Sequence, residues 1–238
     1  MYDNKTIIGI IPARSGSKGL PDKNILPFAG KPLMAWTILT ALGAGVLDEV
    51  FVSTDSGKYA EIARQYGASV PFLRPRELAG DACPASGYIL HALREYRRNL
   101  RRSFDYFALL QPTTPMRTAD HIREGVKKAI DENLTAVVSF SPFDVDPKLI
   151  GSIPEDLNLS GFSSGDTPND SLRQDARQLY VINGMVYVCR CDEYEKTKSF
   201  YGWNSKAMTI DKSFAIDIDD ETDFLTAEHL AKRSGRFV

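Results

Sequence analysis

Residues 6–24, TIIGIIPARSGSKGLPDKN, decide the fold. The run from Thr6 to Ile11 is dominated by β-branched residues and ends at Pro12, which is typical of a fully buried strand in a parallel sheet. Residues 14–24 are rich in Gly, Ser, Lys and Pro without periodicity, so they are predicted to form a loop. A buried strand that leads directly into such a loop predicts an α/β fold with a ligand site at the carboxyl end of the strand.

Strands and helices alternate from this first strand to Phe140. The expected strands are residues 6–11, 49–54, 69–73, 105–111 and 135–140. The expected helices between them are residues 32–45, 56–66, 85–102 and 118–132. The remaining expected elements are strands at 179–189, 207–210 and 214–219 and a last helix at 220–232. This order predicts a mostly parallel, Rossmann-like sheet flanked by helices.

Residues 141–178 interrupt the alternation. They include the polar, turn-rich stretch SGFSSGDTPNDS and contain no clear element. We therefore predict an excursion from the main sheet, either a flap or a dimerisation lobe. The whole chain, residues 1–238, is expected to form one domain that includes this excursion, because its length is enough to bury a single large core.

The composition limits the possible partners and compartments. A net charge of -2 with 25% charged residues gives no indication of binding to nucleic acid or to a membrane surface. The three cysteines are odd in number and no histidine lies at metal-ligand spacing from them, so reduced thiols in the cytoplasm are expected. The apolar run before Pro12 is too short for a signal peptide or a membrane span. The three histidines all lie in predicted helices, which gives no support to a Ser-His-Asp mechanism.

The loop after the first strand combines small residues with three cations. The small residues between 15 and 19 let backbone N–H groups approach an anion closely, and Arg14, Lys18 and Lys23 neutralise it. A nucleoside triphosphate needs this combination, because its leaving pyrophosphate gains charge in the transition state. The string is neither GxGxxG nor GxxxxGK[ST], which disfavours a dinucleotide site and a P-loop. An exposed basic loop without a ligand is the alternative interpretation.

Asp217 and Asp219 form a second candidate group. On the predicted strand, residues two apart share a face, so both carboxylates would point one way while Ile216 and Ile218 enter the core. Two carboxylates at this spacing suit Mg²⁺ or Mn²⁺, whose remaining ligands are phosphate oxygens and water. The alternative is that the acidic residues 219–223 cap the last helix. On the residues alone, both interpretations stay open.

Taken together, these motifs resemble the acylneuraminate cytidylyltransferase family, which comprises the CMP-sialic acid synthetases and their relatives. The matching strings, in chain order, are PAR-x-GSKGLP-x-KN from Pro12, VSTD from Val52, LRP-x-ELA from Leu73, LLQPTTPMRT from Leu109, RQ at Arg173, NG-x-x-Y from Asn183 and IDID from Ile216. They span nearly the whole chain.

This resemblance implies a nucleotide-diphospho-sugar transferase-like fold, a homodimer and a Mg²⁺-dependent reaction. CTP and a nine-carbon 2-keto-3-deoxy sugar acid would give the CMP-sugar and pyrophosphate by in-line attack of the anomeric oxygen on the α-phosphorus. The residues implied to bind the nucleotide are Arg14, Ser17, Lys18, Lys23, Asn24, Arg74 and Asp81. Lys23 would lie closest to the α-phosphate, and Asp217 and Asp219 would hold the metal.

The resemblance also implies an acceptor site. Gln111 would bind the sugar and Arg173 its carboxylate, and the remaining expected contacts are Asn183, Tyr187, Phe200 and Tyr201. Aromatic residues at strand ends are usually part of the core, which is the alternative for the last three. Because the chain departs from the family pattern at Val181 and at residues 144–147, the acceptor stays open between N-acylneuraminic, legionaminic, pseudaminic and shorter 3-deoxy sugar acids. A nucleotide-binding protein without catalysis is the remaining alternative.

Overall fold

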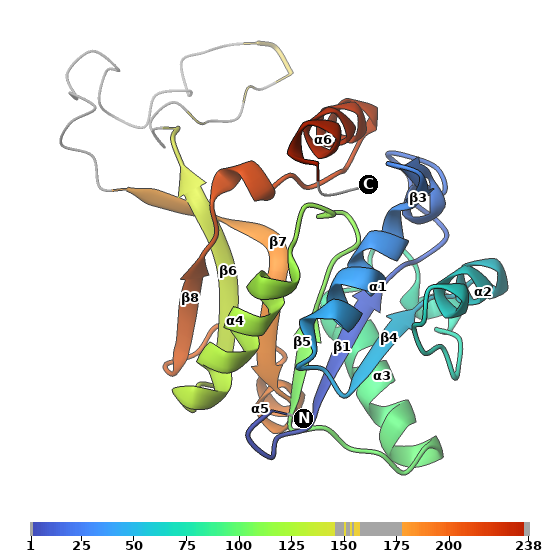
Figure 1. Ribbon diagram of the computed structural model, residues 1–238, viewed down its shortest axis with the longest axis vertical. Helices are drawn as coiled ribbons and strands as arrows, with labels where there is room; N and C mark the ends of the chain where they lie inside the picture. The colour runs from blue at the N-terminus through green and yellow to red at the C-terminus, as the bar shows by residue number, and fades with distance from the viewer. Residues whose placement is uncertain (1, 146–149, 151–152, 154, 158–177, 236–238) are drawn as a thin grey trace.

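A computed structural model of the chain describes residues 2–145, 150, 153, 155–157 and 178–235 (Figure 1). Most of the excursion predicted at 141–178 lies outside the described residues, and so does Arg173. The role of this region as a flap or dimerisation lobe stays a prediction.

Six strands form the central sheet in the order β4-β1-β5-β7-β6-β8. Their bounds are β1 Ile7–Pro12, β4 Glu49–Ser53, β5 Tyr106–Leu109, β6 Ala136–Phe143, β7 Leu179–Arg190 and β8 Ser205–Thr209. β1 pairs in parallel with β4 and β5, and β6 pairs in parallel with β8. β7 runs antiparallel between β5 and β6. The predicted mostly parallel sheet is confirmed, with one reversed strand inserted in it.

Helices cover both faces of the sheet (Figure 1). Their bounds are α1 Leu33–Ala44, α2 Gly57–Gln65, α3 Ala85–Asn99, α4 Ala119–Asp131, α5 Cys191–Thr197 and α6 Glu221–Ser234. Residues of α1, α2 and α4 join one core, whereas α3 and α5 contribute to the core on the opposite face. α6 packs on the short hairpin of β2 (Pro27–Phe28) and β3 (Lys31–Pro32). No helix in the described part of the chain is long and apolar enough to cross a membrane.

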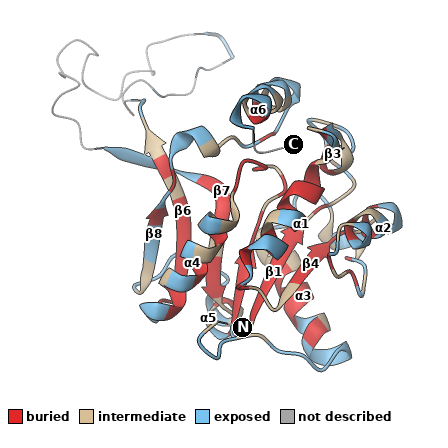
Figure 2. Cartoon of the chain, viewed as in Figure 1, coloured by how far each residue is buried: buried red, intermediate tan, exposed pale blue. Residues whose placement is uncertain are grey.

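Strand β1 separates the two cores (Figure 2). Ile7 and Ile11 face one core and Ile8 and Ile10 the other, and all four side chains are fully buried. Because successive residues of a strand point to opposite faces, a strand between two layers of helices must be apolar at nearly every position. The β-branched run that decides the fold therefore lies at its centre.

Two predicted strands are wrong. Residues 69–73 make only an isolated bridge, in which Ser69 pairs with Phe51, because Pro71 has no N–H to continue a ladder. Residues 214–219 are irregular after a single 3-10 turn at Lys212–Phe214. Their backbone bonds instead to the loop after β5, since the Ile218 N–H donates to the Thr113 carbonyl over 2.8 Å.

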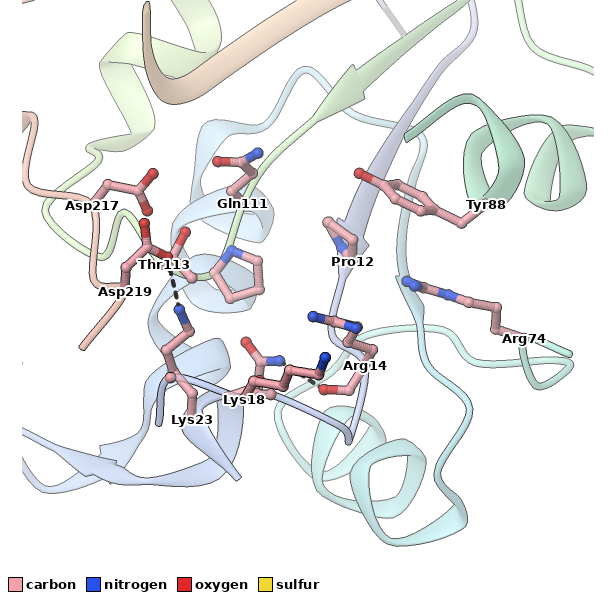
Figure 3. A pocket seen from close by; sticks show the side chains of 14 residues that line it. Pro12, Arg14, Lys18, Lys23, Arg74, Tyr88, Gln111, Thr113, Asp217 and Asp219 are labelled. Carbon is pink, nitrogen blue, oxygen red and sulfur yellow. Dashed lines mark hydrogen bonds and ion pairs between the residues drawn. The ribbon is translucent and has the colours of Figure 1, made fainter. Parts of the chain in front are cut away.

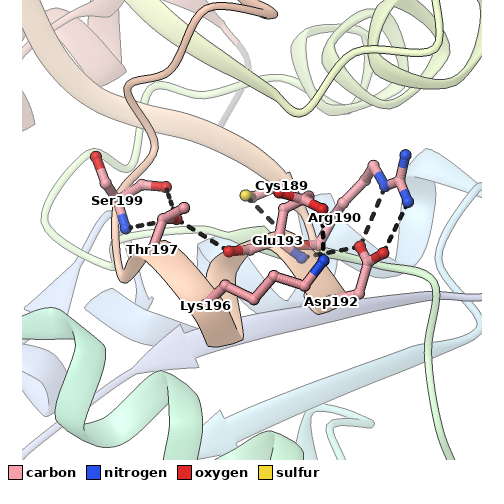
Figure 4. A network of polar contacts seen from close by, with 7 residues as sticks. All are labelled: Cys189, Arg190, Asp192, Glu193, Lys196, Thr197 and Ser199. Carbon is pink, nitrogen blue, oxygen red and sulfur yellow. Dashed lines mark hydrogen bonds and ion pairs between the residues drawn. The ribbon is translucent and has the colours of Figure 1, made fainter.

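Two ion pairs lie at the start of the short helix α5 (Figure 4). Arg190 pairs with Asp192 at 2.7 Å, and Lys196 pairs with Glu193 at 2.9 Å. The neighbouring Cys189 is a free thiol, and burial raises its pKa to about 12, so it stays protonated. This network follows the carboxyl end of β7 and lies at the opposite end of the sheet from the carboxyl end of β1 (Figure 1).

Candidate active site

A cavity of about 500 Å³ opens where the loops after β1 and β5 meet the segment before α6 (Figure 3). The two loops follow neighbouring parallel strands, at the edge of the sheet where the sequence predicted a site. Nine sequence-predicted residues line the cavity: Arg14, Ser17, Lys18, Lys23, Asn24, Arg74, Gln111, Asp217 and Asp219. The other lining residues are Pro12, Gly19, Tyr88, Pro112 and Thr113.

The basic loop after β1 is anchored at its start by Asp55. One carboxylate oxygen of Asp55 accepts from the Ser15 N–H at 2.9 Å and the other from the Ser15 hydroxyl at 2.8 Å. Burial alone would raise the pKa of Asp55, but the hydrogen bonds from Ser15 outweigh it and the pKa is lowered. Asp55 is therefore an ionised clamp that fixes the loop where it leaves the strand.

Two more hydrogen bonds anchor the far end of the loop. The Asn24 amide donates to the carbonyl of Arg14 at 3.0 Å, which closes the loop on itself. The hydroxyl of the buried Tyr59 on α2 donates to Asp22 at 2.8 Å. Asp22 adopts a left-handed backbone with φ of 54°, a conformation that aspartate tolerates better than most residues. The loop is thus preorganised, which an exposed basic loop without a ligand does not require.

Asp81 neutralises two of the loop cations. Its carboxylate lies 2.7 Å from an Arg14 guanidinium nitrogen and 2.7 Å from the Lys18 ammonium. Lys18 first and Arg14 second hold the pKa of Asp81 below its usual range. The sequence predicted Asp81 as a nucleotide contact, whereas the structure makes it the counter-ion of two predicted contacts. A polyanion that enters the cavity competes with Asp81 for both cations.

Lys23 joins the basic loop to the acidic segment. Its ammonium is largely buried and donates to the Ile218 carbonyl and, at 3.1 Å, to the Asp219 carboxylate. Asp219 itself is mostly exposed to the cavity and solvent. The predicted phosphate cation and one predicted metal ligand therefore lie in direct contact.

Asp217 lies deeper than Asp219. Burial raises its pKa, and a hydrogen bond from the Thr113 side chain acts in the opposite direction. Although no strand forms here, the fully buried Ile218 separates the two aspartates, so both carboxylates face the cavity as the predicted alternation required (Figure 3). The helix cap is formed by other residues, because Asp220 and Asp223 bond reciprocally at the start of α6.

Arg74 and Tyr88 form one wall of the cavity. The buried Arg74 guanidinium donates to the Ser53 hydroxyl at 3.0 Å and to the Ser53 carbonyl at 2.7 Å. Its central carbon lies 4.6 Å from the centre of the Tyr88 ring. The sequence singled out Arg74 but not Tyr88, because a tyrosine in the first turn of a helix resembles ordinary core.

Comparison with known sequences assigns this arrangement to a family. A family model described as cytidylyltransferase matches residues 8–231. The chain belongs to the cytidylyltransferase family. It is 39% identical over 231 residues to an N-acylneuraminate cytidylyltransferase of Escherichia coli O18:K1:H7, a match covering 97% of this chain and 53% of that protein. It is 37% identical over 233 residues to the CMP-N,N'-diacetyllegionaminic acid synthase of Legionella pneumophila, covering 94% of this chain and 95% of that protein.

The cytidylyltransferase fold is also supported by a solved structure. The CMP:2-keto-3-deoxy-manno-octonic acid synthetase complexed with CTP has a TM-score of 0.71 to this chain at 17% identity, with 96% of this chain and 99% of that one covered. At this identity the similarity concerns the fold alone. The present chain spans about half the length of the N-acylneuraminate cytidylyltransferases that it matches.

On the predicted acceptor side of the cavity, Arg117 supports the backbone of Gln111. The buried Arg117 guanidinium donates to the Gln111 carbonyl at 2.7 Å, to the Thr114 hydroxyl at 2.6 Å and to the Met185 carbonyl. Burial lowers the pKa of Arg117 to about 9, which leaves the side chain charged at neutral pH. The sequence analysis quoted the PTTPMR string but missed this role, which becomes visible only when β7 lies beside β5.

Four of the predicted acceptor contacts, Asn183, Tyr187, Phe200 and Tyr201, do not line the cavity. Asn183 is buried. Its amide oxygen accepts a hydrogen bond from the Ser139 hydroxyl, and its amide nitrogen donates one to the Ser141 hydroxyl. Phe200 is 9% exposed and packs against the rings of Phe107, Tyr187 and Tyr194, so the core alternative describes it. Tyr187 is half-buried beside it, and Tyr201 is 58% exposed. The structural alternative therefore describes Asn183 and Phe200, whereas an acceptor contact by Tyr187 or Tyr201 stays a prediction.

Proposed function

We propose that this protein transfers the cytidylyl group of CTP to the anomeric oxygen of a nine-carbon 2-keto-3-deoxy sugar acid. The observation that carries the proposal is a single cavity in which a preorganised basic loop faces two carboxylates at the carboxyl ends of parallel strands. Two matched relatives are named for N-acylneuraminate and for N,N'-diacetyllegionaminic acid, and these names support this substrate class.

The reaction follows from the order of groups along the cavity. Arg14 and Lys18 bind the triphosphate once it displaces Asp81, and they stabilise the charge that grows on pyrophosphate as it leaves. The anomeric oxygen of the acid forms a bond to the α-phosphorus while the bond from phosphorus to the pyrophosphate oxygen breaks. The hydroxyl proton of the acceptor is released. Lys23 is held between the loop and Asp219, next to the expected position of the α-phosphate.

We propose Mg²⁺ or Mn²⁺ as the cofactor, held by Asp217 and Asp219. Two carboxylates facing the same cavity fit Mg²⁺, which usually takes one or two carboxylates and fills its other positions with phosphate oxygens and water. Burial of Asp217 supports this choice, because an ionised carboxylate in that position gains from a cation beside it. When bound, the metal ion supplies positive charge to the phosphate oxygens.

Pyrophosphate release tests the proposed reaction. With Mg²⁺ and CTP, a panel of N-acetylneuraminic, deaminated neuraminic, legionaminic, pseudaminic and 3-deoxy-octulosonic acids is expected to give release with at least one nine-carbon acid. CTP with no acid serves as the control for hydrolysis. Release with none of the acids would contradict the enzyme assignment, and release with UTP or GTP in preference to CTP would contradict the base assignment.

A homodimer is proposed from the exposed start of β7. The four residues Leu179–Ile182 are all apolar and 36–50% exposed, and neighbouring residues of a strand face opposite sides. Both faces of this ribbon therefore carry apolar surface that a second copy would bury. Light scattering is expected to give a dimer mass for the wild type and a monomer for Ile182→Glu. Leu225→Glu, which changes an exposed leucine on α6, should keep the dimer. A monomeric wild type would refute the proposal.

A cytoplasmic location is proposed with this function. All three cysteines are free thiols, as expected in a reducing compartment, and CTP is a cytoplasmic nucleotide.

A further inference from the structure

Tyr88 has a hydroxyl with no protein partner in the described part of the chain. The residue lies in the first turn of α3, and the Arg74 guanidinium covers one face of its ring. The ring lines the cavity, and its hydroxyl points toward Gln111, away from Arg74 (Figure 3). Desolvation by burial raises the pKa of Tyr88 to about 12, so the phenol keeps its proton at physiological pH. A half-buried ring with an unused hydroxyl aimed into a cavity is typical of a ligand contact.

The position of the hydroxyl in the cavity indicates which part of the substrate it meets. Figure 3 has Arg14, Lys18 and Lys23 at one end, and Gln111 and Tyr88 toward the other. Because the triphosphate binds the cations, the end near Gln111 is left for the acceptor or the nucleoside. The ring face turned to Arg74 lies beside an expected nucleotide contact, whereas the hydroxyl is directed to the opposite side.

Gln111 and Asp217 define where the acceptor must reach. A Cβ atom built on Gly184 would lie 2.5 Å from the Gln111 amide oxygen and 3.5 Å from an Asp217 carboxylate oxygen, so both groups flank the same glycine. An acceptor that attacks phosphorus beside Asp217 therefore passes Gln111, and its far end approaches Tyr88. Tyr187 on β7 lies near this side too. Burial is the main cause of its raised pKa, and the electrostatic influence of Tyr201, Asp217 and Tyr88, which acts over short distances, raises it further.

We propose that the Tyr88 hydroxyl hydrogen-bonds the sugar-acid acceptor and contributes to its selection. This inference rests on the proposed function. A nine-carbon sugar acid carries a carboxylate and several hydroxyl groups, and any of these accepts a hydrogen bond from a phenol. A site built to bond such a group rejects an analogue that lacks it, because the phenol is then left unpaired.

Tyr88→Phe tests the proposal, because it removes the hydroxyl and keeps the ring beneath Arg74. With the acid that the wild type uses best, the KM for the acid is expected to rise about tenfold, the typical effect of losing one hydrogen bond, while the KM for CTP and the melting temperature stay unchanged. Tyr96→Phe is the matched control on the same helix, since the Tyr96 hydroxyl bonds Glu49 outside the cavity and its loss should leave both KM values unchanged.

An unchanged KM for the acid in an active Tyr88→Phe variant overturns this proposal alone. A rise in the KM for CTP instead overturns it too, because the hydroxyl would then contact the nucleotide. A wild-type protein that uses no acid in the panel overturns the proposed function and this inference together, so the two failures are distinguishable.

Discussion

Asp217→Asn is expected to lower kcat by about three orders of magnitude while raising the melting temperature of the metal-free protein by a few degrees. Burial raises the pKa of Asp217, so its ionised form is less stable in the folded protein than in the unfolded chain. This cost is present above the folded pKa and disappears as the pH falls toward the unfolded value. Asparagine carries no charge and keeps a polar group beside Thr113, so it removes both the cost and the proposed metal ligand.

Calorimetry without metal at neutral and at acidic pH, together with pyrophosphate release, measures both effects. The stabilisation should shrink in acid. Asp219→Asn should lose turnover without a gain in stability, because its carboxylate is mostly exposed. Asp211→Asn, an exposed carboxylate outside the cavity, should retain wild-type kcat. Wild-type kcat in both cavity variants would contradict the metal site, and a lower melting temperature for Asp217→Asn would contradict the account of its burial.

Gly184→Ala is expected to lower kcat/KM for the acid about a hundredfold, with a stability loss of about 1–2 kcal/mol. Gly184 has φ of 71°, which disfavours any residue with a Cβ atom. The added atom would also meet the Gln111 amide oxygen at 2.5 Å. The flexible Gln111 side chain must rotate away, and with it goes a predicted acceptor contact. Steady-state kinetics and thermal unfolding measure the two effects.

Gly45→Ala separates the backbone effect from the loss of Gln111. Gly45 has φ of 67° at the end of α1, and a Cβ atom there would meet nothing within 4 Å. It should lose similar stability and keep wild-type kinetics. Equal kinetics in the two variants would show that Gln111 does not depend on the space at Gly184.

The sequence predicted the first strand and its loop well because both depend on local signals. Burial between two layers demands the apolar run, and the loop follows from its Gly, Ser and Pro content. The facing of Asp217 and Asp219 was also predicted correctly although their strand was not. Alternation needs only an extended backbone, which here bonds to Thr113 instead of a neighbouring strand.

Other features depend on contacts between distant segments. The apolar pattern of a strand is the same in either direction, so the antiparallel course of β7 was not predicted. The hydrogen bond from Arg117 to the Met185 carbonyl on β7 was not predicted either. Within the Asn183-Gly184 pair, Asn183 bonds to β6 and Gly184 provides the space for Gln111. Tyr88 was missed because only its neighbours in space distinguish it from a core residue.

The most direct measurement of the central claim is a ³¹P NMR spectrum of the protein with CTP, Mg²⁺ and the preferred nine-carbon acid. Cytidylyl transfer predicts that the three CTP resonances are replaced by one phosphodiester resonance and pyrophosphate in equal amounts, and that neither appears without the acid. Formation of CDP and inorganic phosphate, or of free CMP without a CMP-sugar, would contradict the account.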